Sequence, residues 1–339
     1  MEFGAAFWVE RTDWPSLRQA ALAAEAAGFD ALWIDDHLLN DEGDVDAPKL
    51  EAWTVLAALA AVTSRPTLGP LVGANTLRNP GLLAKIAVTV DEISAGRLVL
   101  GLGAGWFERE HDAFGFEFGA SAGERIDRLA EALPLVRRLL DGEHVTHDGR
   151  WYHLRDAFCS PAPRHRVPIL VGGSGPRKTL PLVARSADAW NTYATPAELA
   201  HRSAILDAAC RDAGRDPGSI HRSVNVNVVV RPSAREAQAA FDAVLDTHDP
   251  QPGEEALDVG GPPEDVARLV AAYAQLGVDQ VIWVFRSPWD EETIAALPAV
   301  RAALAEAVAG DPASSTSASA PDTRRPRPHP APTGSSPTR

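Results

Sequence analysis

The chain has 339 residues, enough to bury one large core or two smaller ones. Hydrophobic residues make up 45% of it and charged residues 23%, which is usual for a globular protein. The formal net charge of -14 disfavours nucleic acid and anionic membrane surfaces as partners, because both attract a basic face, and no apolar run approaches the roughly 20 residues that span a bilayer.

Two further features indicate the cytoplasm. The N-terminus lacks the basic region and following apolar stretch of a secretion signal. The two cysteines, Cys159 and Cys210, lie far apart and without a pairing motif, as expected in a reducing compartment. We therefore expect a cytoplasmic protein without a disulfide framework.

Short apolar strands alternate with amphipathic helices along the chain. In the first half we expect strands at 2–9, 29–34, 67–74 and 97–102, and helices at 13–27, 51–62, 80–95 and 121–140. In the second half we expect strands at 168–171, 187–193, 223–230 and 280–285. We expect one helix that ends at 184, two that begin after Thr195 and Ser233, and two that span 263–276 and 291–308. Residues 247–263 are rich in Pro, Gly and acidic residues and are expected to form a long loop.

Eight strands that alternate with helices predict an α/β fold of the (β/α)8 TIM-barrel type in residues 1–308. The alternative is a doubly wound open sheet, but the strand count reaches eight with no domain boundary in between. Residues 143–165 interrupt the alternation. They contain a hairpin pattern around Asp148-Gly149, so we expect an insertion there.

The C-terminal segment has a different composition. Residues 311–339 contain no Ile, Leu, Val, Phe, Met, Trp or Tyr and are rich in Pro, Ser, Thr and Arg. Such a segment cannot bury enough apolar surface to offset its ordering entropy. We therefore expect a disordered tail at 309–339.

One strand runs into a glycine-rich turn. The apolar residues 167–171 are followed by Gly172-Gly173-Ser174-Gly175, and then by Arg177 and Lys178. A strand, a glycine turn and a helix N-terminus together bind anions, because backbone N–H groups and the helix dipole favour negative charge. We predict that this turn binds a cofactor phosphate; the alternative is a plain strand-to-helix connection.

In a TIM barrel the active site lies at the C-terminal ends of the strands. That rule selects Glu10, Asp35, Asp36, His37, Asn75, Arg78, Gly103, Gly105, Trp106, Glu110, His111, Trp190, Asn191 and Arg286. Among them His37 is the leading acid–base candidate, because histidine titrates near neutral pH and Asp36 is its neighbour. The alternative is a structural histidine.

A metal site and a binding site for a planar ring are the other candidates at these strand ends. No spacing of His, Asp and Glu around Asp36 and His37 matches a metal motif, so we expect no metal. Trp106 and Trp190 are suited to wall a planar ring, or else belong to the core.

Several of these segments resemble the bacterial luciferase-like superfamily. The similar blocks are Trp33-Ile34-Asp35-Asp36-His37, residues 78–85, Ile93 to Trp106, Val171 to Gly175 and Ala187 to Asn191. The likeness covers roughly residues 1 to 305 and is most specific at 78–111. The sequence is most similar to the actinobacterial branch that uses the deazaflavin coenzyme F420, whereas other members use FMN.

The resemblance implies a barrel that holds a flavin or deazaflavin ring over its strand ends. It implies a phosphate on the turn from Gly172 to Gly175, and a non-prolyl cis peptide at Leu71–Val72 that bulges against the ring. It also places Asn75, Gly103, Trp106 and Trp190 around the cofactor. Deazaflavin has carbon at position 5 and transfers hydride there.

The resemblance further places His37 near the reacting carbon, with Asp36 beside it. Some deazaflavin relatives have a glutamate directly after the glycines of strand four, where this chain has Trp106. That difference shifts the acid role to His37, with Glu110 as a more distant candidate.

We therefore expect an oxidoreductase that uses F420 to transfer hydride to or from a small organic substrate. One alternative is an FMN-dependent monooxygenase supplied by a separate reductase, and another is a non-catalytic flavin-binding relative that would not need His37. From the resemblance we also expect a homodimer, and a flavin or F420 reductase as the supplier of reduced cofactor.

Overall fold

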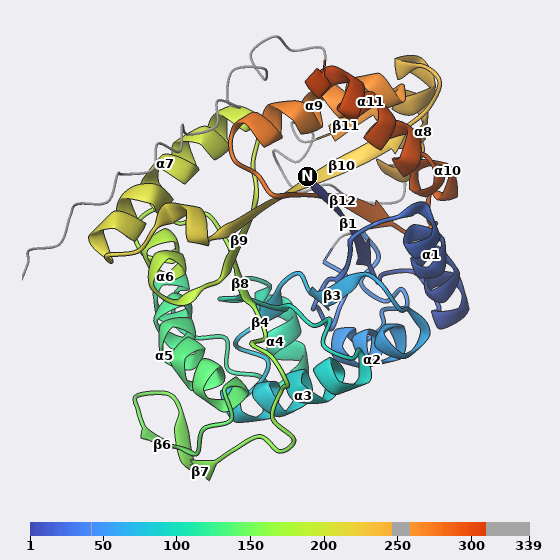
Figure 1. The fold of residues 1–339 in the computed structure, drawn as a ribbon. Coiled ribbons are helices and arrows are strands. Elements are labelled where there is room, and N and C mark those ends of the chain that lie inside the picture. The colour runs from blue at the N-terminus through green and yellow to red at the C-terminus, as the bar shows by residue number, and fades with distance from the viewer. Residues whose placement is uncertain (42, 246–257, 310–339) are drawn as a thin grey trace, which may run out of the picture.

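The computed structural model describes residues 1–41, 43–245 and 258–309 (Figure 1). Most of the loop expected at 247–263, and all but the first residue of the tail expected at 309–339, lie outside the described residues. No described helix is long and apolar enough to cross a membrane.

Parallel strands form a barrel surrounded by helices (Figure 1). The barrel strands are β1 (Glu2–Trp8), β2 (Ala31–Ile34), β3 (Thr67–Pro70), β4 (Gly73–Ala74), β5 (Leu100–Gly103), β8 (Ile169–Gly172), β9 (Ala189–Tyr193), β10 (His221–Val230) and β12 (Gln280–Arg286). Their order is β3-β2-β1-β12-β10-β9-β8-β5-β4. Because β3 and β4 are two parts of the single strand expected at 67–74, the order returns to its start. The predicted TIM barrel is confirmed.

Helices cover the outside of the barrel (Figure 1). They are α1 (Trp14–Ala27), α2 (Ala52–Val62), α3 (Pro80–Ile93), α4 (Glu108–Phe114), α5 (Ala122–Leu140), α6 (Thr179–Ser186), α7 (Pro196–Asp212), α8 (Ala234–Leu245), α9 (Pro263–Gln275), α10 (Glu291–Ala295) and α11 (Leu297–Ala309), with a 3-10 turn at Pro217–Ser219.

Local sequence signals set several of the helix ends. The Asp13 side chain accepts a hydrogen bond from the Ser16 N–H, and Gly28 ends α1 with a φ of 94°. Thr195 and Glu198 form the predicted capping box of α7. These contacts explain why the helix starts could be predicted so closely.

Four elements differ from the expectation. The strand at 67–74 is divided by a cis peptide at Leu71–Val72. The helix expected at 291–308 is two helices, because Pro298 lies at the start of α11 and disfavours helical backbone before it. Helix α4 and the short strand β11 (Asp258–Gly261), which pairs with β10, were not expected.

The insertion is an antiparallel hairpin outside the barrel, formed by β6 (Val145–Asp148) and β7 (His153–Ala157) (Figure 1). Glu131 on α5 holds its turn by accepting hydrogen bonds from the N–H groups of Trp151 and Tyr152. The Tyr152 hydroxyl in turn accepts a hydrogen bond of 2.8 Å from Asn75 Nδ2 at the barrel top. The insertion therefore helps to position a residue beside the strand ends.

The larger part of the hydrophobic core lies between the strands and the helices. A smaller cluster fills the inside of the barrel, formed by Ala6, Ala31, Trp33, Leu71, Leu170, Ala189, Ile282 and Val284. The indole N–H of Trp33 donates to Gln280 Oε1 at 3.1 Å, so its polar atom is satisfied inside the barrel. These side chains close the lower barrel and leave the C-terminal strand ends for a site.

Candidate active site

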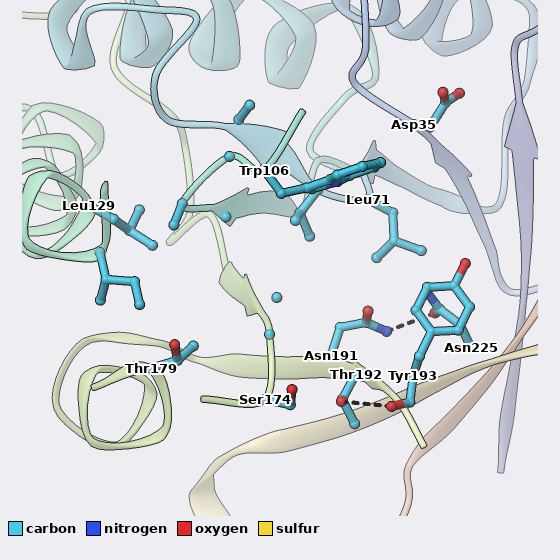
Figure 2. Close-up of a pocket in the computed structure, with 18 of the residues that line it drawn as sticks. Asp35, Leu71, Trp106, Leu129, Ser174, Thr179, Asn191, Thr192, Tyr193 and Asn225 are labelled. Carbon is cyan, nitrogen blue, oxygen red and sulfur yellow. Dashed lines mark hydrogen bonds between the residues drawn. The ribbon is translucent and has the colours of Figure 1, made fainter. Parts of the chain in front are cut away.

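A cavity of about 530 Å³ opens at the C-terminal ends of the strands (Figure 2). Of the predicted site residues it is lined by Asp35, His37, Leu71, Val72, Gly103, Gly105, Trp106, Gly172, Gly173, Ser174 and Asn191. Other predicted residues are not among those that line it: Glu10, Asp36, Asn75, Arg78, Glu110, His111, Gly175, Trp190 and Arg286.

His37 is held by a carboxylate from a distant segment. Its Nδ1 lies 3.1 Å from Glu110 Oε1, and the second oxygen of Glu110 accepts from the Leu38 N–H at 2.7 Å. The Glu110 side chain is fully buried, whereas that of His37 is 16% exposed. Trp106 lies edge-on to the imidazole, with ring centroids 5.3 Å apart. Glu110 therefore fixes the ring, and leaves Nε2 as the nitrogen available to the cavity.

The surroundings favour protonated His37. Burial opposes the charge, but the hydrogen bond that Nδ1 donates to Glu110 and the negative charges of Asp41, Glu110 and Asp35 outweigh it, and the pKa of His37 is raised above 6.5. Folding therefore favours the protonated ring. This contribution to stability is fully present below pH 6.5 and is lost as the pH rises through the raised pKa.

Replacing Glu110 by Gln removes the charge that supports the imidazolium. We expect the pKa of His37 to fall relative to the wild type, because burial then opposes the protonated form with less compensation. An NMR titration of the His37 ring measures this. The Glu108→Gln variant is the control, since Glu108 is exposed and begins the same helix. An unchanged His37 titration in Glu110→Gln would refute the pairing.

Asp36 does not contact His37 through its carboxylate. Both of its oxygens bind the guanidinium of Arg78, at 2.6 and 3.0 Å, and Oδ2 also accepts from the Ala74 N–H at 3.2 Å. Asp36 is buried. Asp36 therefore links the end of β2 to β4 and to the segment that follows β4. We predicted that Asp36 assists His37 directly, but the carboxylate that contacts His37 is that of Glu110.

Three carboxylates and one lysine surround the side of the cavity near His37. Lys49 Nζ binds Glu10 Oε1 at 2.8 Å and Asp35 Oδ2 at 2.5 Å. Burial and a hydrogen bond with Asp41 raise the pKa of Glu10 to about 7, although the Lys49 charge lowers it. Near neutral pH Glu10 is therefore partly protonated and can donate to Asp41, which lines the cavity.

The predicted cis peptide is present at Leu71–Val72, and both residues line the cavity. Val72 packs against two glycines: a Cβ on Gly103 would lie 2.7 Å from Val72 Cγ2, and one on Gly172 would lie 2.8 Å from the same atom. Glycine is therefore needed at both positions to leave room for the bulge. The bulge in turn forms part of the cavity wall beside the glycine turn.

The glycine turn is fixed on both sides. The Gly173 N–H donates to the Asn191 carbonyl at 3.0 Å, and the Trp190 indole N–H donates to the Gly173 carbonyl at 2.7 Å. Trp190 is fully buried, so it supports the turn from behind and does not wall a ring. In the described part of the chain, the N–H groups of Ser174 and Gly175 have no acceptor.

The sequence suggested that the glycine turn leads straight into a helix. In the structure it does not. Helix α6 begins at Thr179, four residues after Gly175, and Thr179 lines the cavity. Lys178 binds Asp127 at 2.7 Å, whereas Arg177 is exposed. Any anion at the turn therefore meets backbone N–H groups and the start of α6 more than the Lys178 charge.

Sequence reasoning missed several lining residues: Trp8, Asp41, Thr192, Tyr193, Arg202 and Asn225. Asn225 accepts from Asn191 Nδ2 at 2.9 Å (Figure 2). The alternation of Ser223, Asn225 and Asn227 along a buried strand was a signal for polar side chains pointing into the barrel. Arg202 gives no such signal, since it lies on α7 after the strand.

The chain is similar to several known proteins. The family model described as luciferase-like monooxygenase matches residues 1–280. An F420-dependent glucose-6-phosphate dehydrogenase of Kineococcus radiotolerans is 30% identical, over 82% of this chain and 88% of that protein. A protein of the same name from Microbacterium testaceum is 35% identical, over 62% of each chain. An F420-dependent secondary alcohol dehydrogenase bound to an F420–acetone adduct shares the fold with a TM-score of 0.76, at 22% identity over 89% of this chain and 98% of that one.

Proposed function

This chain belongs to the luciferase-like monooxygenase family, and we propose that it is an oxidoreductase that uses coenzyme F420 to transfer hydride to or from a small organic substrate. The proposal rests on one cavity that combines a glycine turn, whose N–H groups at residues 174 and 175 have no acceptor among the described residues, with a histidine held by a buried carboxylate. The names of the relatives support F420 as the cofactor.

The residues of the cavity fit such a cofactor. Within the described part of the chain, the N–H group of Ser174 in the cavity and that of the adjoining Gly175 have no acceptor, and they suit its phosphate. Leu71 and Val72 present an apolar surface to the cavity, which suits a flat ring. Because Gly103 and Gly172 have no side chains, Val72 can pack directly against their strands. Among the described residues, the buried Oδ1 of Asn75 has no hydrogen-bond donor. Asn75 is not among the lining residues, so its role at the cofactor is proposed from the resemblance alone.

Bound F420 supplies a carbon centre that accepts or delivers hydride. His37 moves the proton that accompanies this hydride, at Nε2, to or from the oxygen of the substrate. Glu110 holds the imidazole through Nδ1 and stabilises its positive charge. Asp36 has a positioning role, because its hydrogen bonds with Arg78 and the Ala74 N–H fix the backbone that follows the bulge.

We also propose that the protein acts in the cytoplasm as a homodimer, with reduced cofactor supplied by a separate reductase where the reaction needs it. Leu82 and Ile93 on α3 are 56% and 43% exposed, and apolar side chains of this kind are suited to a subunit interface. Sedimentation of the purified protein tests the dimer, and a single species of about monomer mass would refute it.

Changing the glycine turn tests where the cofactor binds. Gly173 has a φ of 131°, where an alanine Cβ would also lie 3.1 Å from Thr179 Cγ2. The turn is held on both sides and cannot relax freely, so we expect Gly173→Ala to raise the F420 dissociation constant by about tenfold. Cofactor fluorescence measures this binding.

The control for this variant is Gly277→Ala. Gly277 also has a positive φ, 77°, but a Cβ there would meet nothing within 4 Å. Both variants carry a backbone cost, and only the one at the turn should weaken F420 binding. Equal affinities in the two variants would move the cofactor phosphate away from the turn.

A further inference from the structure

One side of the cavity is acidic. Asp35 lies across the cavity from the glycine turn at Ser174 (Figure 2). Asp35 and Asp41 line the cavity, and the two groups that accompany them, Glu10 and Glu110, are also carboxylates. Among the described residues, the positively charged groups that pair with these four acids are Lys49 and, when it is protonated, His37.

The cations on this side are already engaged. Lys49 is 4% exposed and bridges Glu10 and Asp35, so it cannot turn toward a ligand without breaking two ion pairs. His37 binds Glu110 through Nδ1, which leaves Nε2 facing the cavity. The four acids still outnumber the two cations, even though Glu10 is partly protonated, so an anion that enters this side meets a net negative charge.

Arg202 is the one arginine among the described residues that line the cavity. Its Nη1 donates to Thr192 Oγ1 at 3.0 Å and to the Tyr193 carbonyl, and its Nη2 donates to Glu198 at 3.2 Å. Ser174 and Thr192 lie near each other in Figure 2, on the side opposite Asp35. The arginine thus belongs to the side that suits the cofactor phosphate.

Among the described residues, no lysine lines the cavity. The sequence holds three lysines: Lys49, Lys85, which donates to the Ser160 carbonyl, and Lys178, which binds Asp127. Residues 246–257, which lie outside the described part, contain no lysine or arginine. Arg286 donates to Asn227 Oδ1 at 3.0 Å and is not among the lining residues.

The geometry points to a substrate that carries no negative charge: an uncharged or cationic hydroxyl or carbonyl compound that binds between His37, Trp106 and the Asp35–Asp41 side of the cavity. This inference rests on the proposed hydride transfer. It separates this chain from the relatives named as glucose-6-phosphate dehydrogenases, whose named substrate carries a phosphate.

Two matched pairs of compounds test the inference: glucose against glucose 6-phosphate, and 2-propanol against lactate. Each is titrated into the protein by calorimetry, with and without F420, and its reaction is followed by the loss of F420 absorbance. We expect the anionic member of each pair to bind and react no better than the neutral one. Tighter binding or a higher kcat/KM for glucose 6-phosphate than for glucose would overturn the inference.

Reversing the charge of Asp41 tests whether this side of the cavity disfavours anions. Asp41→Lys places a cation on this side of the cavity, and we expect it to improve the affinity for glucose 6-phosphate relative to glucose by about tenfold. Asp46→Lys is the control, because Asp46 is exposed in the same loop, does not line the cavity and changes the net charge equally. The same gain in both variants, or no gain in Asp41→Lys, would refute a local charge effect.

The F420 titration separates this inference from the proposed function. If F420 does not bind, the proposed function fails. The calorimetry without F420 still measures whether the cavity binds the anionic compound more weakly than the neutral one. If F420 binds and glucose 6-phosphate is preferred, the substrate class alone is wrong.

Discussion

Replacing His37 by Ala is expected to lower kcat/KM by about 10²- to 10⁴-fold, which is the usual contribution of a general acid–base group. The reason is that His37 is the titratable side chain that both lines the cavity and is held by a buried carboxylate. F420 affinity should change little, because the glycine turn lies elsewhere in the cavity. Steady-state kinetics and cofactor fluorescence on the same preparation measure the two effects.

The matched control is His153→Ala. His153 is exposed on the insertion hairpin, and its side-chain partner among the described residues is the exposed Asp148. Wild-type kcat/KM in that variant shows that loss of a histidine is not harmful in itself. Unchanged turnover in His37→Ala would contradict the proton role and favour a non-catalytic relative that binds the cofactor.

Replacing Gly101 by Ala is expected to destabilise the protein by about 3 kcal/mol, at the upper end of what overpacking costs. A Cβ at this position would lie 2.1 Å from the Pro70 carbonyl oxygen and 3.3 Å from Val72 Cγ1. Backbone atoms on both sides of the contact belong to barrel strands, so they cannot move away without separating β3 from β5. Urea unfolding followed by circular dichroism measures the loss.

Gly123→Ala is the control for this change. Gly123 lies in the first turn of α5, and the atoms closest to a new Cβ are 3.6 and 3.7 Å away. Alanine is a better helix former than glycine, so stability should stay the same or rise by up to about 1 kcal/mol. A similar midpoint for Gly101→Ala and wild type would mean that the strands are not packed as closely as described.

The barrel was predictable because its signals are local. Alternating apolar runs, the Asp13 and Thr195 caps and the stop at Gly28 each act within a few residues, and the structure shows them in place. Helix α4 was missed for the opposite reason. It has seven residues and no side-chain cap, and only Glu110 and His111 are buried in it.

The partners within the site could not be read from local patterns. Glu110 lies 73 residues after His37, and Arg78 lies 42 residues after Asp36, so only the closed barrel brings each pair together. The neighbouring Asp36 was the reasonable partner in the sequence. Residues 36 and 37 follow the end of β2 at Ile34, and there Asp36 binds Arg78 while His37 binds Glu110.

The central claim is tested most directly by equilibrium binding of F420 and of FMN, side by side, to the purified full-length protein. We expect tight binding of F420 and weak binding of FMN, and substrate-dependent loss of F420 absorbance in the wild type. A clear preference for FMN would contradict it and would favour an oxygen-dependent monooxygenase served by a reductase. Failure of both to bind would contradict the phosphate role of the turn from Gly172 to Gly175.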